Sequence, residues 1–418
     1  MTRLTKVFVI LMIVAVVAAT GLSKMNLPLP QRRSDVRVVD LRCECMANPL
    51  GVDVPQPRLS WKLESRWRGQ RQTACQVLVA SSEKMLQDDR ADLWDSGKVA
   101  SDQSIHIVYA GRPLPSRTCC YWKVRIWDAE DKASPFSEVA LWDMGLLTPG
   151  DWKGKWISAP GKDDDKSPQP APLFRKSFLL PERPASARLY ICGLGYHELR
   201  LNGEKVGDHV LDPAFTRYDK RALYVTHDVT RQLRKGSNAL GVILGNGWYN
   251  MHTRCVWDFD KAPWRDRPVL RCQLEMTFDD GSTRIVASDG TWRVSTGPIL
   301  FDSIRNGETY DARLEKADWD AADYDDSNWP LAQVDAGPKG ELRAQMMPPI
   351  KVTKTLGSAK FTEPQPGVYV FDIGQNLAGW ARLKVSGPAG TEVVMKYGER
   401  LNPDGTLDQK EIGQHIKT

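Results

Sequence analysis

The sequence predicts an all-β protein built from tandem β-sandwiches. Short runs alternate apolar and polar residues, as in Glu198 to Asn202, Ala222 to Thr226 and Ala239 to Leu244, and turn pairs such as Asn-Gly and Gly-Ser punctuate them. This is how antiparallel strands and tight turns are encoded. The 27 prolines and 32 glycines leave little room for long helices, and no pair of long amphipathic helical segments follows Pro149.

Length and net charge limit the class of protein to which the chain can belong. A chain of 418 residues corresponds to about three domains. The net charge of +5 is small and the basic residues are dispersed, so the electrostatic footprint of a nucleic-acid-binding protein is missing. Fifteen tryptophans are an unusual load. Aromatic faces often form the floor of sugar sites, although a core position is the more common role for any single tryptophan.

Residues 1–22 predict a signal peptide. Two basic residues precede an apolar run that begins at Val7, and the stretch from Ala18 to Gly21 supplies small residues for cleavage. Even extended to Leu22, the run has 16 residues, fewer than the roughly 20 that span a bilayer, so an uncleaved anchor is the minority interpretation. We expect a secreted or periplasmic chain with no membrane span after signal cleavage.

Residues 36–147 are expected to form the first sandwich. QTACQVLVASS and CCYWKVRIWD supply alternating strands, and the prolines fall between strands, where their missing N–H removes no ladder bond. Cys120 shares its strand parity with Trp122, which predicts a core thiol. The even count of eight cysteines permits disulfides, but their connectivity is not readable. The pattern fits a fibronectin type III or immunoglobulin-like domain that acts as a scaffold.

Residues 151–172 are predicted to be a linker. DWKGKWISAP is followed by GKDDDKSPQPAP, which has charge and proline but no periodicity. The run from Asp163 to Asp165 is interpreted as a solvated loop and not as a metal site, because nothing in the sequence fixes its geometry.

Residues 173–336 are predicted to form a jelly-roll sandwich. A hairpin is expected at Asp279-Asp280-Gly281. The motif YDDSNW, from Tyr324 to Trp329, is typical of galactose-binding-like jelly rolls in many glycosidases.

Three strings in this segment carry a resemblance to a known family: LNGEKVGD (Leu201 to Asp208), LDPAFTRYDKR (Leu211 to Arg221) and LGNGWY (Leu244 to Tyr249). They resemble the N-terminal, non-catalytic domain of bacterial α-L-rhamnosidases of glycoside hydrolase family 78. NPLGVDVPQPRLSW (Asn48 to Trp61) and NGETYDARLE (Asn306 to Glu315) resemble the same family.

Residues 349–418 form the third expected unit. FDIGQNLAGW, from Phe371 to Trp380, resembles the concanavalin-like domain that lies in this family between the binding domain and the catalytic barrel. The unit holds about seventy residues, fewer than that domain normally has. We therefore expect a truncated concanavalin-like domain that exposes apolar strand edges such as Val393 to Met395.

The resemblance implies an inverting glycosidase that hydrolyses terminal α-L-rhamnosyl residues of glycosides or polysaccharides, without a redox cofactor. Such hydrolysis needs two carboxyl groups on opposite sides of the anomeric carbon. In this family both come from an (α/α)6 barrel, which no segment here predicts, so we expect no catalytic residue in this chain. Acidic residues in the jelly-roll segment, such as Asp311, Asp325 and Asp326, are expected to cap turns or to be charges at the rim.

The resemblance also implies a carbohydrate-binding role for the jelly-roll segment. Some members bind rhamnose there through calcium, with an Asp-Asn pair and an Asn at a glycine-rich turn, which by local register correspond to His197, Glu198 and Asn246. An imidazole is a poor ligand for a hard cation, which leaves Glu198 and Asn246 as the candidate metal ligands. Trp248 and Tyr249 would add a stacking surface; the alternative is that Trp248 is buried in an interdomain contact.

The expected partner is a rhamnose-containing glycan or glycoside, together with a catalytic domain outside this chain. A free-standing rhamnoside-binding protein and a cell-surface scaffold remain the alternatives. The sequence contains no P-loop, HExxH or GxSxG motif, so it gives no support to nucleotide, zinc-protease or serine-hydrolase chemistry.

Overall fold

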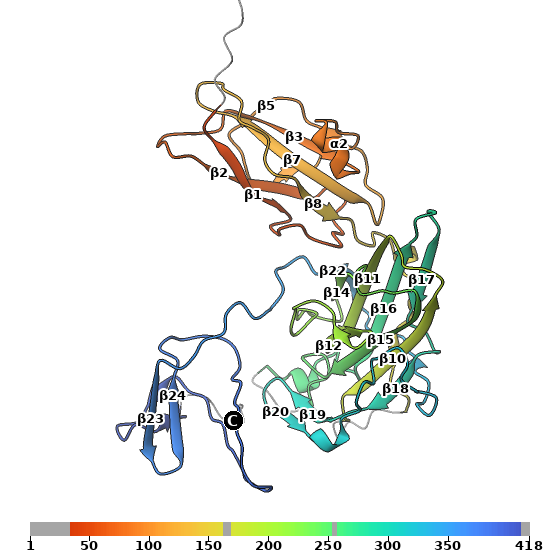
Figure 1. Cartoon of the computed structure of the whole chain (residues 1–418), viewed down its shortest axis with the longest axis vertical. Coiled ribbons are helices and arrows are strands. Elements are labelled where there is room, and N and C mark those ends of the chain that lie inside the picture. Colours follow the sequence, from red (N-terminus) through yellow and green to blue (C-terminus); the bar gives the residue numbers. More distant parts are fainter. Residues whose placement is uncertain (1–33, 162–168, 253–256, 411–418) are drawn as a thin grey trace, which may run out of the picture.

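The computed structural model describes residues 34–161, 169–252 and 257–410. Within these ranges the regular structure is almost entirely β, which confirms the predicted all-β class. Figure 1 shows a first sandwich (red to orange), a second one (yellow-green to cyan) and a third unit (blue) as three successive bodies. The predicted signal peptide, residues 1–22, lies outside the described residues. In the ranges above, no helix is long and apolar enough to cross a membrane.

The first sandwich consists of two antiparallel sheets. One sheet contains β1 (Arg37–Cys43), β2 (Arg58–Glu64) and β6 (Ile107–Val108). The other contains β4 (Trp94–Asp95), β3 (Ala74–Ala80), β7 (Cys119–Trp127) and β8 (Ala140–Asp143), with β5 (Val99–Ala100) paired to β3 and a short helix α2 (Glu83–Gln87) beside it.

Strand β7 shows how the sequence pattern specifies this core. Its alternate residues Cys120, Trp122, Val124 and Ile126 are all fully buried. Successive side chains of a strand point to opposite faces, so the period of two places these four on one inner face. The Trp122 ring packs edge-on against Trp142 of β8, with ring centroids 6.3 Å apart. The predicted core thiol at Cys120 is confirmed.

The second sandwich is larger and also has two sheets. The five-stranded sheet has the order β13 (Glu204–Lys205), β12 (Tyr196–Leu201), β15 (Gly236–Gly245), β10 (Pro172–Leu180), β18 (Arg293–Thr296). The other has the order β21 (Gln333–Val334), β9 (Ile157–Ser158), β16 (Val269–Thr277), β11 (Ser186–Leu194), β14 (Arg221–Asp228), β22 (Glu341–Ala344), and β17 (Thr283–Ala287) pairs with β16. A hairpin of β19 (Ile299–Ser303) and β20 (Gly307–Tyr310) and the short turns η1 (Pro149–Asp151), η2 (Phe259–Lys261) and η3 (Ala312–Leu314) complete it.

Two strands of this sandwich lie outside the segment predicted for it. The β9 residues Ile157 and Ser158 fall in the predicted linker, yet they pair with β16. Beyond the predicted end at residue 336, β22 pairs in parallel with β14. Both are short edge strands, whose few residues carry no readable alternation. The predicted hairpin at Asp279-Asp280-Gly281 joins β16 to β17, where Gly281 takes the left-handed conformation with φ of +80°.

The first two sandwiches share an interface. Arg117 of the first contacts Glu275 of β16 through a hydrogen bond of 2.7 Å from Nη2, and it also bonds Asp151. The Tyr224 hydroxyl of β14 accepts a hydrogen bond of 3.0 Å from the backbone N–H of Leu146. Trp152, Tyr190 and Tyr224 belong to a buried cluster that also includes Leu146, so this contact is apolar inside and charged outside.

The third unit, from residue 349 onward, contains two hairpins. One joins β23 (Lys360–Gln365) to β24 (Val368–Asp372) and the other joins β25 (Arg400–Leu401) to β26 (Leu407–Asp408). The segment between them has no assigned strand. Its apolar side chains are largely exposed, among them Trp380, Val385 and Val394.

Candidate functional site

The glycine-rich turn after β15 is fixed by contacts within the protein. The Asn246 backbone N–H donates to Asp302 Oδ1 over 2.8 Å, and its side-chain amide donates to Asp302 Oδ2 over 2.9 Å. Its side-chain oxygen accepts a hydrogen bond of 2.9 Å from Asn250 Nδ2. The Asn246 side chain is buried and both its nitrogen and its oxygen have protein partners, so it connects the turn to the β19–β20 hairpin.

His197 and Glu198, two of the predicted sugar-binding residues, are divided between two faces of β12. Leu199 and Leu201 of this strand point into the core, so His197 points inward with them and Glu198 points outward. The Glu198 carboxylate forms ion pairs with Arg200, at 3.0 Å, and Lys205, at 3.6 Å. In the described ranges no hydrogen bond or shared partner joins Glu198 to Asn246. The structure therefore does not bring the predicted calcium ligands together.

Trp248 and Tyr249 of the same turn have different environments. Tyr249 is 1% exposed and packs edge-on against Tyr218, with ring centroids 5.3 Å apart. Trp248 is half-buried and contacts Phe215 and Phe259, at centroid distances of 6.0 Å and 5.5 Å. Of the predicted pair, only Trp248 retains an accessible ring.

Trp248 is part of a larger surface cluster, here called the aromatic platform, formed by Phe215, Trp248, Trp257, Phe259 and Trp264. Neighbouring ring centroids lie 5.4 to 6.4 Å apart. Trp257 is 56% exposed and Phe215 is 43% exposed. Exposed aromatic residues that are contiguous on a soluble protein mark an interaction site more often than scattered ones do.

The β19–β20 hairpin borders the aromatic platform through Arg305. The Arg305 guanidinium lies 4.8 Å from the centre of the Trp257 ring and 5.9 Å from that of Trp248. Asp302 lies opposite Glu308 in the β19–β20 hairpin. Burial raises the pKa of Asp302, although hydrogen bonds from Asn246 partly offset this, and the pKa of Glu308 is raised by burial and by the Asp302 charge. The platform thus has one cation at its edge, and the hairpin that carries this cation also holds the Asp302 and Glu308 carboxyl groups.

Sequence reasoning missed most of this surface. It identified Trp248, but it interpreted the strings that contain Phe215 and Asn306 only as family signatures. The available signal was the density of aromatic residues from Trp248 to Trp264.

Two hollows lie on the second sandwich. One has a volume of about 350 Å3, and its lining includes Asn246, Asn250 and Arg267. The Arg267 guanidinium there already bonds Asp335. The other, of about 580 Å3, lies between Ile243 on the five-stranded sheet and the β19–β20 hairpin.

The described residues contain no helical barrel. Their helices are one α-helix of five residues and three 3-10 turns of three residues each. In the YDDSNW motif, Asp325 accepts a backbone hydrogen bond from Ser327, as predicted for a turn. The prediction is wrong for Asp326, which forms an ion pair with the buried Arg175. We assign no catalytic residue in these ranges.

Comparison with known families accounts for all three units. Residues 38–148 match the Rha78A-like N-terminal immunoglobulin domain, 182–354 match the α-L-rhamnosidase N-terminal domain, and 362–418 match the bacterial α-L-rhamnosidase concanavalin-like domain. An α-L-rhamnosidase of Formosa agariphila is 39% identical over 390 residues, which is 86% of this chain and 41% of that protein. The chain belongs to the bacterial α-L-rhamnosidase family. The predicted membership in glycoside hydrolase family 78 is confirmed.

Solved α-L-rhamnosidases share the fold. The enzyme from Dictyoglumus thermophilum superimposes with a TM-score of 0.76 at 40% identity, covering 89% of this chain and 42% of the other. The Streptomyces avermitilis enzyme, whose crystal structure is a complex with L-rhamnose, gives 0.81 at 30% identity, covering 91% and 53%. The chain therefore spans about two fifths to one half of the length of these rhamnosidases and corresponds to their N-terminal, β-rich region.

Proposed function

We propose that this chain serves as the N-terminal part of an exported α-L-rhamnosidase, and that the whole protein hydrolyses terminal α-L-rhamnosyl residues of glycosides or polysaccharides. Three consecutive rhamnosidase domains along one chain are the observation that carries this proposal. The signal peptide predicted from the sequence of residues 1–22 supports export to the periplasm or the medium.

The role of the second sandwich in this proposal is to bind carbohydrate on the aromatic platform. An aromatic face packs against the apolar side of a pyranose, while polar groups at its edge bond the hydroxyls. Rhamnose is a 6-deoxy sugar, and its methyl group enlarges the apolar side. The platform supplies the rings, and the Arg305 guanidinium supplies a polar group at their edge, while Glu308 lies on β20 of the same hairpin. This combination also favours the second candidate function, a free-standing rhamnoside-binding protein.

Calorimetric titration with L-rhamnose and with rhamnosylated oligosaccharides tests carbohydrate binding. We expect measurable heat at millimolar sugar and a loss of binding in Trp257→Ala, because the substitution removes an exposed ring without disturbing the core. Trp67→Ala is the matched control, since Trp67 is 61% exposed but lies in the first sandwich. Equal heats for both variants would disprove the platform as the binding surface. A parallel titration with a chelator tests whether calcium takes part.

An activity assay tests whether this chain alone hydrolyses a rhamnoside. We expect no release of the aryl group from an aryl α-L-rhamnoside by this chain alone, because no catalytic carboxyl pair is assigned in it. Turnover by the wild-type chain that is lost in Asp302→Asn would contradict this view. It would indicate that the catalytic carboxyl groups lie in the hairpin that carries Asp302 and Glu308.

A further inference from the structure

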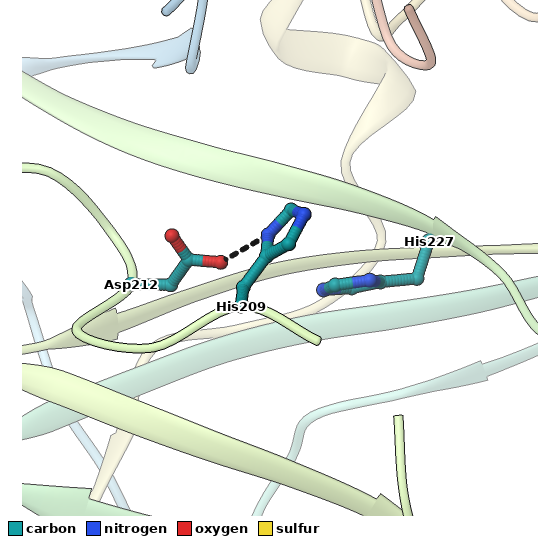
Figure 2. Close-up of side chains that lie close together, drawn as sticks. All are labelled: His209, Asp212 and His227. Atoms are coloured by element: carbon teal, nitrogen blue, oxygen red, sulfur yellow. Dashed lines mark hydrogen bonds and ion pairs between the residues drawn. The ribbon is translucent and has the colours of Figure 1, made fainter. Parts of the chain in front are cut away.

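Three side chains capable of binding a metal meet at one end of the second sandwich. His209 and Asp212 lie in the loop that follows β13, and His227 lies on β14 (Figure 2). One donor atom from each lies within 4.8 Å of the other two. Nδ1 of His209 is 2.6 Å from Oδ2 of Asp212, and the His209 and His227 ring centroids are 5.4 Å apart. Figure 2 shows the His227 ring extending toward the other two residues.

His227 occupies a position where an apolar side chain would be expected. On β14 it shares its face with Val225 and Val229, which belong to the core, and it pairs with Leu189 of β11. It is only 9% exposed, and no hydrogen bond reaches its ring from the described part of the chain. Burying a polar group without a partner costs free energy, so apolar packing alone does not account for an imidazole here.

The loop is shaped around this imidazole. Gly207 has φ of +72°, and a β-carbon at that position would lie 3.3 Å from Nδ1 of His227. The loop backbone therefore covers the Nδ1 side of the ring. The opposite nitrogen, Nε2, remains directed toward His209 and Asp212 (Figure 2).

Asp212 is held in place by partners outside the trio. Its Oδ1 accepts a hydrogen bond of 3.2 Å from Gln345 Nε2, and its backbone carbonyl accepts one of 2.8 Å from the N–H of His197. Gln345 is itself fixed, because its side-chain oxygen accepts a hydrogen bond of 2.7 Å from the Ala214 N–H. Outer partners that orient a carboxylate in this way are typical of metal sites. Nδ1 of the neighbouring His197 is also buried and has no hydrogen-bond partner in the described ranges.

We propose that His209, Asp212 and His227 bind one divalent transition-metal ion of the zinc type. Two imidazoles and one carboxylate suit zinc and its neighbours, whereas calcium requires oxygen ligands. Zinc–ligand bonds of about 2.0 to 2.2 Å place donor atoms roughly 3.3 Å apart, so small side-chain rotations bring the trio into range. Binding replaces the hydrogen bond between His209 and Asp212 with two metal–ligand bonds.

The metal would connect three parts of the chain. His209 pairs through its backbone with Lys351, and the N–H of Val210 donates to the Ile350 carbonyl over 2.9 Å. The loop that carries two ligands thus also holds the segment that leads from the second sandwich into the third unit. A bound ion would fix this segment to β14 and stabilise the junction.

Titration of the chelator-treated, untagged chain with Zn2+ tests the proposal. We expect one ion per chain and a rise in Tm of about 5 to 10 °C when free zinc exceeds Kd by roughly 100-fold. His209→Gln is the main variant, because His209 is half-buried in a loop and its loss should spare the fold. Its affinity should fall by more than the roughly 10- to 100-fold expected for Gln345→Leu, which removes only an outer partner. Ca2+ should leave Tm unchanged.

His106→Gln is the matched control, since His106 is an exposed histidine in the first sandwich and should leave zinc affinity unchanged. Visible absorption of bound Co2+ gives a second measurement that does not depend on stability, and its bands should vanish in His209→Gln and in His227→Phe. Zinc binding that is equal in wild type and His209→Gln would overturn the proposal, as would a wild-type chain that binds no zinc.

Discussion

The buried Arg175 of β10 forms an ion pair with the partly buried Asp326, and its loss should destabilise the second sandwich. Its guanidinium is 1% exposed and binds the Asp326 carboxylate, while Nε donates to the Trp319 carbonyl over 2.9 Å and Nη2 donates to the Ala321 carbonyl over 2.7 Å. Arg175→Met keeps much of the apolar stem but leaves one carboxylate and two carbonyl groups without their donor. Removing one member of a buried pair costs about 3 to 5 kcal/mol.

That free energy corresponds to a large thermal shift. For a domain of 150 to 250 residues, 1 kcal/mol changes Tm by roughly 2 to 4 °C, so we expect Arg175→Met to lower Tm by about 6 to 20 °C in differential scanning calorimetry. The control is Arg313→Met, which breaks an arginine–aspartate pair whose arginine is 88% exposed and should change Tm little. If both variants shift Tm equally, the reasoning that burial makes the Arg175 pair important is wrong.

Three further outcomes are expected. Arg117→Met removes the ion pair to Glu275 at the interface of the two sandwiches, so the sandwiches should unfold in two separate calorimetric transitions. Glu275→Gln should give the same result. A single unchanged transition in both variants would contradict this prediction. Burial raises the pKa of Asp151, but hydrogen bonds from Arg117 and nearby hydroxyls outweigh it and hold this pKa below its usual range. As the pH falls, the unfolded chain therefore takes up the proton before the folded chain does, and the stability that this group contributes above about pH 4 is lost. The difference in the free energy of unfolding between pH 5 and pH 3, measured with urea, should be smaller in Asp151→Asn than in the wild type. Iodoacetamide should alkylate the exposed Cys45 in the native chain but leave Cys43 unmodified until urea is added. The reason is that Cys43 is 1% exposed and burial raises the pKa of its thiol. Equal labelling of the two cysteines in tandem mass spectra of the native chain would refute this prediction.

Most of the sheet structure was predictable because strand periodicity directly reports burial. The alternation at Cys120 and Trp122 indicates one inner face, and both side chains are fully buried in β7. The turn at Asp279-Asp280-Gly281 indicates a hairpin, and β16 and β17 form it. These features depend on neighbours within about ten residues, so the local sequence contains the information.

The candidate site was not predictable to the same degree. The aromatic platform combines Phe215, the segment from Trp248 to Trp264 and the border residue Arg305, which three separate connections of the fold bring together. His197 and Glu198 show a second reason why the site was hard to predict, which is that residues adjacent in sequence need not lie on the same face. Adjacent residues of a strand point to opposite faces, so a ligand pair transferred by register separates as soon as its segment forms a regular strand.

The third unit shows why alternation alone does not produce a strand. The sequence ARLKVSG around Val385 and EVVMKYG around Val394 alternates as well as β7 does, yet neither is assigned as a strand, and these two valines are 60% and 61% exposed. A strand is stabilised by cross-strand partners and by an apolar face that another layer covers. In β7 the partner strands β3 and β8 and the covering sheet are present, whereas the described part of the third unit provides only two short hairpins. The difference between the units therefore lies in available partners and not in local propensity, which is why the same pattern predicts structure correctly in one and not in the other.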